Sequence, residues 1–449
     1  MHQTIPVLDN FLFALALLRS RTVENVLEAK EMLEKLLPFQ TETGGFPIYL
    51  HDYPHCKERY LPIWIGLIVC RILAEFAHVL GSEMRERLTG ALQKLVGNVK
   101  ELAEQSTPPY AIAVSRAALF LKAGELLKEK GIEQQGAAWM EAIDKIANYP
   151  DWLSPKALGM LLNALSLVYP LLEQSPWKTL LSFLGVVWHS HLGTYVGPPY
   201  QVFQSKNEPQ VTLLDHYMGG YEGLFSKRAL RESHLHLEAA MVYLTDDLVP
   251  QSHYPDQFGL ISVGVPCEFF KGENSAYTFF NGKPTTLPNN LEKGFHHALF
   301  FWGDRDNLHT MDIQRARVGA VACRVIPNGV EVLFTLDAEL PDEDKERNRE
   351  IIVAIDRFPE SSFTVDGHVS SVFQLGQELI VDERYSLKFE LRSGEGKFLG
   401  HRMPGNRFSQ VAIGENNRYD AYDWLIFLRC IARQGPCKMA LIIQKININ

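Results

Sequence analysis

The stretch "RVGAVACRVIPNGVEVLFTL", residues 317–336, decides the fold of the second half of this chain. After the dipeptide Asn328–Gly329, the apolar residues Val330, Val332 and Phe334 stand at every other position. A short run of this kind is typical of a strand, and Asn-Gly between two such runs is a strong signal for a tight hairpin. This stretch therefore predicts two antiparallel strands joined at Asn328–Gly329.

Short runs of the same kind recur along the chain after residue 250. Turn signals separate several of them, at Asp366–Gly367 and within 392–397. Many short strands at regular spacing predict an antiparallel β-sandwich. The further runs cover residues 259–270, 296–302, 350–357, 361–373, 385–403, 408–414, 422–433 and 438–446.

The first half of the chain has a helical period instead. Apolar residues recur at mostly three- and four-residue steps in 22–37, in 82–104 and in 110–131, where the helix is expected to stop at Gly131. Nine or ten helices are expected, one of them over residues 176–193. Their short connections should produce antiparallel hairpins, which make either a solenoid or an α/α toroid, and the lack of a fixed repeat weakens the solenoid interpretation. The predicted fold is α+β, with an incomplete α/α toroid over 1–250 and a β-sandwich over 251–449.

Composition limits the classes of function. The chain has 449 residues, 46% of them hydrophobic, and a net charge of −9, which argues against nucleic-acid binding. Six cysteines without a CxxC spacing predict a reducing compartment, and we expect a cytoplasmic protein; a secretion signal that the N-terminus does not reveal is the alternative. The apolar run 60–70 has 11 residues before Arg71, short of the roughly 20 that span a bilayer.

Three loops of the helical half are rich in aromatic and polar residues. They cover residues 40–60, 189–210 and 216–238. If the helices close into a ring, these loops lie at the same end and line one cavity. Aromatic rings stack on sugar faces while polar groups bind hydroxyls and carboxylates, so an acidic oligosaccharide or polysaccharide is the predicted partner. The alternative is that these loops only cap the helical hairpins. The predicted substrate-binding residues are Asp52, Tyr53, Tyr200, Tyr217, Arg228 and Arg231.

The stretch "HYMGGYEGLF", residues 216–225, carries a resemblance to a known family. Its segment Tyr217–Tyr221 resembles the Tyr-x-Gly-x-Tyr stretch of the hyaluronate/chondroitin lyases, and Tyr-Glu-Gly is faintly similar to a loop of heparinase II/III-like enzymes. Both families combine a helical toroid with a β-sandwich. The resemblance implies that Tyr221 is the catalytic tyrosine. The position at the spacing of the family's histidine is Thr212 here, and its Asp-Gly-Ser lead-in is absent.

The implied reaction is β-elimination at a uronic acid. It requires a base for the proton next to the carboxylate, an acid for the leaving oxygen and a cation that neutralises the carboxylate. Tyr221 is the candidate acid and base, with His216 or His234 as the assisting base, and Arg228 or Arg231 as the cation. His234 and His236 would point apart on the predicted helix, so neither a metal site nor a cofactor is expected.

Two hypotheses of function follow from the sequence. The first is a lyase that cleaves an acidic glycan. The second is a scaffold that binds a glycan or a protein in the toroid cleft without catalysis.

Overall fold

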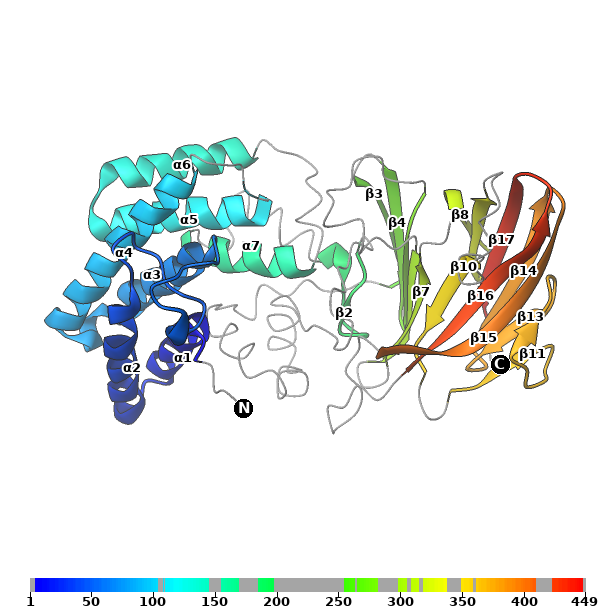
Figure 1. The fold of residues 1–449 in the computed structure, drawn as a ribbon, viewed down its shortest axis with the longest axis horizontal. Coiled ribbons are helices and arrows are strands. Elements are labelled where there is room, and N and C mark those ends of the chain that lie inside the picture. The colour runs from blue at the N-terminus through cyan, green and yellow to red at the C-terminus, as the bar shows by residue number, and fades with distance from the viewer. Residues whose placement is uncertain are drawn as a thin grey trace. The chain divides into compact units, whose positions relative to one another are not determined.

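The computed structural model describes residues 5–103, 108, 110–144, 155–168, 185–197, 254–262, 265–281, 298–304, 308–314, 318–336, 349–357, 361–408 and 422–446. These residues belong to two compact units (Figure 1). The helical unit lies within 1–184, and the strand unit holds 185–197 together with the described residues from 254 onward. The predicted order of a helical part followed by antiparallel sheets is confirmed. The predicted boundary near 250 falls outside the described residues and stays a prediction.

Very short turns join α1 to α2, α3 to α4 and α5 to α6 in the helical unit, whereas a long loop joins α2 to α3. Thr22 caps the second helix, where its side chain accepts a hydrogen bond from the Asn25 N–H. The described helices are α1 Val7–Ser20, α2 Val23–Leu36, η1 Leu37–Phe39, η2 Leu50–Asp52, α3 Leu61–Leu80, α4 Ser82–Ala103, α5 Tyr110–Leu127, α6 Lys130–Asp144 and α7 Pro155–Val168.

The end of α5 differs from the expectation that this helix would stop at Gly131. Lys128 takes the left-handed conformation with φ of 59°, which ends the helix at Leu127, and Gly131 lies inside α6. Glycines serve instead to let α5 and α6 approach closely. A Cβ at Gly136 would lie 2.5 Å from the Leu121 backbone nitrogen.

Helix α3 runs through the core of the helical unit. It continues past Arg71, so the 11-residue estimate of its apolar length was wrong. By length and composition Leu61–Leu80 could cross a membrane, but 67% of its most apolar window is buried inside the unit, as in the core helices of globular proteins. Burial of an apolar face against other helices explains this composition.

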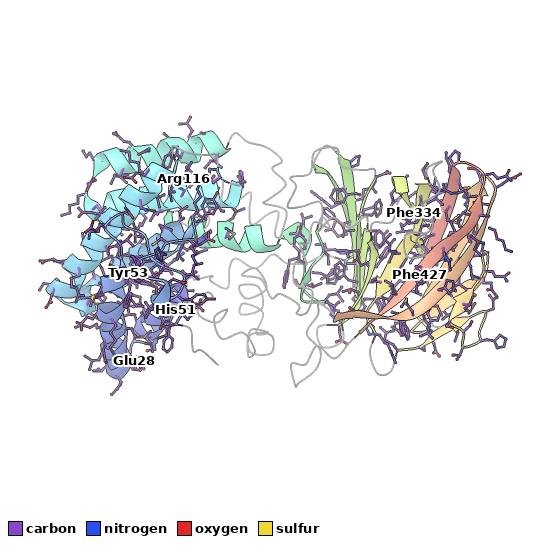
Figure 2. The ribbon with its side chains drawn as sticks, in the orientation of Figure 1. Glu28, His51, Tyr53, Arg116, Phe334 and Phe427 are labelled. Carbon is purple, nitrogen blue, oxygen red and sulfur yellow. The ribbon has the colours of Figure 1, made fainter. Side chains whose placement is uncertain are left out.

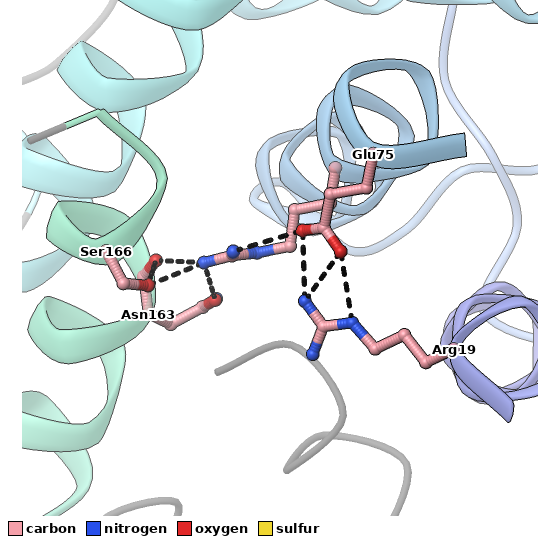
Figure 3. A network of polar contacts seen from close by, with 5 residues as sticks. Arg19, Glu75, Asn163 and Ser166 are labelled. Atoms are coloured by element: carbon pink, nitrogen blue, oxygen red, sulfur yellow. Dashed lines mark hydrogen bonds and ion pairs between the residues drawn. The ribbon is translucent and has the colours of Figure 1, made fainter. Parts of the chain in front are cut away.

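A polar network crosses this apolar core (Figure 3). The Arg71 guanidinium is 3% exposed and donates to the Asn163 carbonyl at 2.8 Å and to the Ser166 hydroxyl at 2.6 Å, both on α7. The Arg71 Nη1 atom lies 3.8 Å from the Glu75 carboxylate, which also accepts hydrogen bonds from Arg19 on α1. The network therefore connects α1, α3 and α7 through one buried cation.

Two antiparallel sheets form the sandwich of the strand unit. The nine-stranded sheet has the order β12-β15-β16-β10-β7-β6-β5-β4-β3, and the six-stranded sheet has the order β11-β13-β14-β17-β9-β8. The strands are β3 Asp256–Ser262, β4 Val265–Gly272, β5 Ser275–Phe280, β6 Ala298–Gly303, β7 Leu308–Gln314, β8 Val318–Ile326, β9 Gly329–Leu336, β10 Arg349–Ile355, β11 Phe363–Val365, β12 Val372–Phe373, β13 Glu378–Val381, β14 Tyr385–Ser393, β15 Gly396–Phe408, β16 Tyr422–Arg433 and β17 Cys437–Lys445.

The predicted Asn328–Gly329 hairpin joins β8 and β9. Asn328 has φ of 59°, and Val330, Val332 and Phe334 are fully buried in the core between the sheets. A Cβ at Gly329 would lie 1.9 Å from the Ile443 carbonyl oxygen of β17, so glycine is required there by the close pairing of β9 and β17.

A small hairpin covers part of the outer face of the nine-stranded sheet. The sequence predicted a helix across residues 188–193, but β1 Trp188–His189 and β2 Thr194–Tyr195 pair there as strands. Leu192 and Val196 are buried against apolar residues of β5, β6 and β7. Contact with an existing sheet thus overrides the local helical pattern.

His189 holds this hairpin to the sheet. Its Nδ1 atom accepts a hydrogen bond from the Leu192 N–H at 3.1 Å and lies 3.1 Å from the Tyr254 hydroxyl. The proton therefore sits on Nε2, which donates to the Gly272 carbonyl at 2.7 Å. Burial lowers the pKa of His189 to about 4, so the ring is neutral at physiological pH.

Candidate functional site

The loop between α2 and α3, residues 40–60, is held rigidly against α4. The Gln40 side-chain amide donates to the Ala91 carbonyl at 2.9 Å, and the Asn98 amide donates to the Thr43 carbonyl at 2.9 Å. Gly44 has φ of +87°, and a Cβ there would lie 2.1 Å from the Lys94 carbonyl oxygen. A loop without regular structure is therefore fixed in place by packing that only glycine permits.

The middle of the same loop is anchored to the start of the described chain. Phe46 is 1% exposed and packs edge-on against Phe11 of α1, with ring centroids 5.3 Å apart. The Val7 N–H donates to the Ile48 carbonyl at 2.9 Å. The residues that follow Ile48 thus begin from a well-defined position.

Two predicted binding residues, the partly exposed Asp52 and the exposed Tyr53, lie in this loop. Figure 2 labels Tyr53 and the nearby His51. Tyr53 is 45% exposed and meets the Phe39 ring edge-on, with centroids 5.6 Å apart. Tyr49 and His51 stack face to face at 5.6 Å, and the His51 Nε2 atom lies 3.9 Å from the Asp52 carboxylate. Exposed ring faces beside a carboxylate suit contacts with the faces and hydroxyls of a sugar.

Two arginines lie over aromatic rings, one where the loop enters α3 and the other between α5 and α6. The Arg59 guanidinium lies 5.7 Å from the centre of the Tyr60 ring, and the Arg116 guanidinium of α5 lies 4.3 Å from the centre of the Trp139 ring of α6. All four side chains are partly exposed. We call Arg59, Tyr60, Arg116 and Trp139 the cation–aromatic cluster.

The guanidinium groups of the cation–aromatic cluster have no carboxylate partners among the described residues. Arg59 donates to the Leu102 carbonyl at 3.2 Å, and neither Arg59 nor Arg116 forms an ion pair with the residues that the structure describes. Burial lowers the pKa of Arg116, while the nearby Tyr60 opposes that shift. Arginine nevertheless stays charged at neutral pH, so the cluster offers planar cationic donors to an anion.

The sequence did not single out this cluster. Arg116 stands in the apolar helical run "AIAVSRAALF", residues 111–120, and a lone cation in such a run is the signal that could have found it. Trp139 looked like an ordinary residue of an amphipathic helix. Only the packing of α5 against α6 brings these two side chains together.

The other predicted site residues lie outside the described residues and stay predictions. They are Tyr200, His216, Tyr217, Tyr221, Arg228, Arg231 and His234. Within the described ranges, no group of three or more His, Cys, Asp and Glu side chains could hold a metal ion.

The fold of this chain is shared with polysaccharide lyases. The chondroitin AC lyase of Streptomyces coelicolor A3 is 8% identical with a TM-score of 0.53, and the match covers 97% of this chain and 74% of that enzyme. A Paenibacillus xanthan lyase is 9% identical with a TM-score of 0.55, covering 99% of this chain and 54% of that one.

A further likeness, to the heparan sulfate lyase HepC of Pedobacter heparinus, has 10% identity and a TM-score of 0.38 over 95% of this chain and 74% of that enzyme. No protein-family model and no curated protein matches the sequence. At these identities the comparisons show the fold alone.

Proposed function

We propose that this protein binds an acidic oligosaccharide at the cation–aromatic cluster and cleaves it by β-elimination. The observation that carries the proposal is the pair of arginines on aromatic rings, Arg59 on Tyr60 and Arg116 on Trp139, without ion pairs in the described part of the chain. The fold shared with chondroitin and xanthan lyases supports the same class of ligand.

The chemistry of binding follows from these side chains. A guanidinium can hold a carboxylate or a sulfate through two parallel N–H donors. An indole or phenol ring covers the apolar face of a sugar, and the exposed loop with Tyr49, Asp52 and Tyr53 adds further rings and a hydrogen-bond acceptor. A neutral sugar would leave the two cations without a partner, which favours an acidic one.

The cleavage step remains assigned to residues outside the described ranges. In it, Tyr221 takes the proton from the carbon next to the uronate carboxylate, with His216 or His234 assisting. Arg228 or Arg231 neutralises that carboxylate as negative charge builds up on it. The bond between carbon and the leaving oxygen then breaks, Tyr221 returns a proton to that oxygen, and an unsaturated uronate remains.

Binding is tested by calorimetric titration of the full chain with hyaluronan, chondroitin sulfate, heparin, alginate and pectin oligosaccharides. Replacing Arg116 with Gln should weaken binding about tenfold, because a charge-assisted hydrogen bond contributes about 1.5–3 kcal/mol. The matched control is Arg87→Gln, which removes an exposed cation of α4. Equal affinities for Arg116→Gln and the parent would refute this binding site.

Cleavage is tested by the ultraviolet absorbance of the unsaturated uronate with the same substrates. The parent protein should produce it, and Tyr221→Phe should not. Absence of product with every substrate that binds would support the second hypothesis, a scaffold without catalysis. Thr212 stands where the resembling lyases have their histidine, and this difference is the reason for testing a scaffold without catalysis.

A further inference from the structure

The outer face of the nine-stranded sheet is partly exposed along two neighbouring strands, β15 and β16. Trp424, Ile426 and Leu428 of β16 point into the core between the sheets, so the residues between them point outward. On β15, Phe398 belongs to the same core, and a Cβ at Gly400 would meet the core ring of Phe373. The outward residues, which we call the β15–β16 face, are Leu399, His401, Met403, Leu425, Phe427, Arg429 and Ile431.

The β15–β16 face combines the Arg429 cation and the His401 imidazole with apolar groups, and none of its seven residues carries a carboxylate. The His401 ring stacks on Phe427 at 5.1 Å and 23° (Figure 2 labels Phe427). Arg429 forms no ion pair with the described residues, and its neighbour on β15 is Leu399. Burial lowers the pKa of His401, and the positive charge of Arg429 lowers it further. Two basic groups thus lie close together, and no carboxylate among the described residues pairs with Arg429.

On the outer face of the six-stranded sheet, arginines of strands are paired with carboxylates. There Glu331 of β9 is 5% exposed and accepts hydrogen bonds from both Arg324 of β8 and Arg392 of β14. Arg392 also lies 2.9 Å from the Glu390 carboxylate. Both arginines are therefore paired with carboxylates, whereas Arg429 has no such partner among the described residues. Its guanidinium is therefore available to an anion from outside.

Apolar exposure on the same face limits the kind of anion. Ile431 is 51% exposed and Met403 is 39% exposed, which are high values for large apolar side chains on strands. The other part of this sheet surface is covered by the β1–β2 hairpin through Leu192 and Val196. A ligand for the uncovered part should carry both negative charge and apolar faces, as a chain of acidic sugar rings does.

We propose that the β15–β16 face is a second contact surface for an acidic glycan, with a carboxylate or sulfate held between His401 and Arg429 and sugar faces lying on Met403 and Ile431. The identity of the ligand rests on the function proposed above, but the surface lies in the strand unit and shares no residue with the cation–aromatic cluster.

The test uses the full chain and chondroitin sulfate oligosaccharides of increasing length. Replacing Arg429 with Gln should weaken binding of the longer oligosaccharides about tenfold, because a charge-assisted hydrogen bond is lost. Lys438→Gln is the matched control, since Lys438 is an exposed cation of β17 in the other sheet. In the parent protein, the NMR titration midpoint of His401 should rise when the oligosaccharide is added, which a purely structural histidine would not show.

The outcomes separate this inference from the proposed function. If Arg116→Gln weakens binding while Arg429→Gln and the His401 midpoint do not change, the second surface is refuted and the first stands. If only Arg429→Gln weakens binding, the first site is refuted and the second stands. Binding of a DNA fragment that depends on Arg429, without binding of any glycan, would overturn the acidic-sugar assignment, and absence of all binding would overturn both proposals.

Discussion

Replacing Arg71 with Met should destabilise the helical unit by about 2–4 kcal/mol. The substitution removes a buried guanidinium that donates to the Asn163 carbonyl, the Asn163 side chain and the Ser166 hydroxyl at 2.6–3.2 Å. Breaking a buried ionic contact by removing one partner typically costs about 3–5 kcal/mol. The expected cost is lower here because Glu75 keeps its hydrogen bonds to Arg19 and so is not left as an unpaired buried charge.

The measurement is thermal unfolding of the full chain, followed by circular dichroism of the helical signal. For a unit of this size each kcal/mol shifts Tm by roughly 2–4 °C, so a decrease of about 4–16 °C is expected. The control is Arg19→Met, whose ion pair with Glu75 is partly exposed at 15% and 36% and should contribute only about 0.2–1 kcal/mol.

A second substitution identifies the origin of the loss. Asn163→Leu removes one acceptor that Arg71→Met leaves without its donor. The double variant should therefore lose less unfolding free energy than the two single variants lose together. If Arg71→Met costs no more than Arg19→Met, or if it adds fully with Asn163→Leu, the buried network does not stabilise the packing of α3 on α7 as the structure indicates (Figure 3).

Three further predictions concern single positions. The folded pKa of His189 is about 4 against 6.5 for an unperturbed histidine, so the unfolded chain binds a proton before the folded chain does as the pH falls. Stability should therefore be full above pH 6.5 and fall by about 3 kcal/mol between pH 6.5 and 4. Thermal melts should show this slope, and His189→Gln should flatten it. Gly44→Ala should cost about 1–3 kcal/mol in urea unfolding because its Cβ meets the Lys94 carbonyl, whereas Gly97→Ala in α4, with open space around it, should stabilise by about 0.5–1 kcal/mol. Glu331→Gln should cost about 1–3 kcal/mol by removing the carboxylate that holds two arginines, and an unchanged midpoint would contradict that role.

Local pattern was sufficient to predict the main elements of the fold. The three- and four-residue period of 22–37 and the alternation around Asn328–Gly329 depend only on which side of a helix or strand is buried, and both are confirmed. The helix predicted through residues 188–193 is wrong, because 188–189 pair with 194–195 as strands and Leu192 packs on apolar residues of β5, β6 and β7 that come much later in the chain.

The candidate site depended much more on tertiary structure. The sequence alone indicated an aromatic and polar loop with Asp52 and Tyr53, since such residues exceed what a connection requires. It could not associate Arg59 and Tyr60 with Arg116 and Trp139, because the first two end the 40–60 loop and the others come from α5 and α6. Local side-chain periodicity thus determined which elements form, whereas long-range packing decided which charges are left without partners, and those charges carry the proposed function.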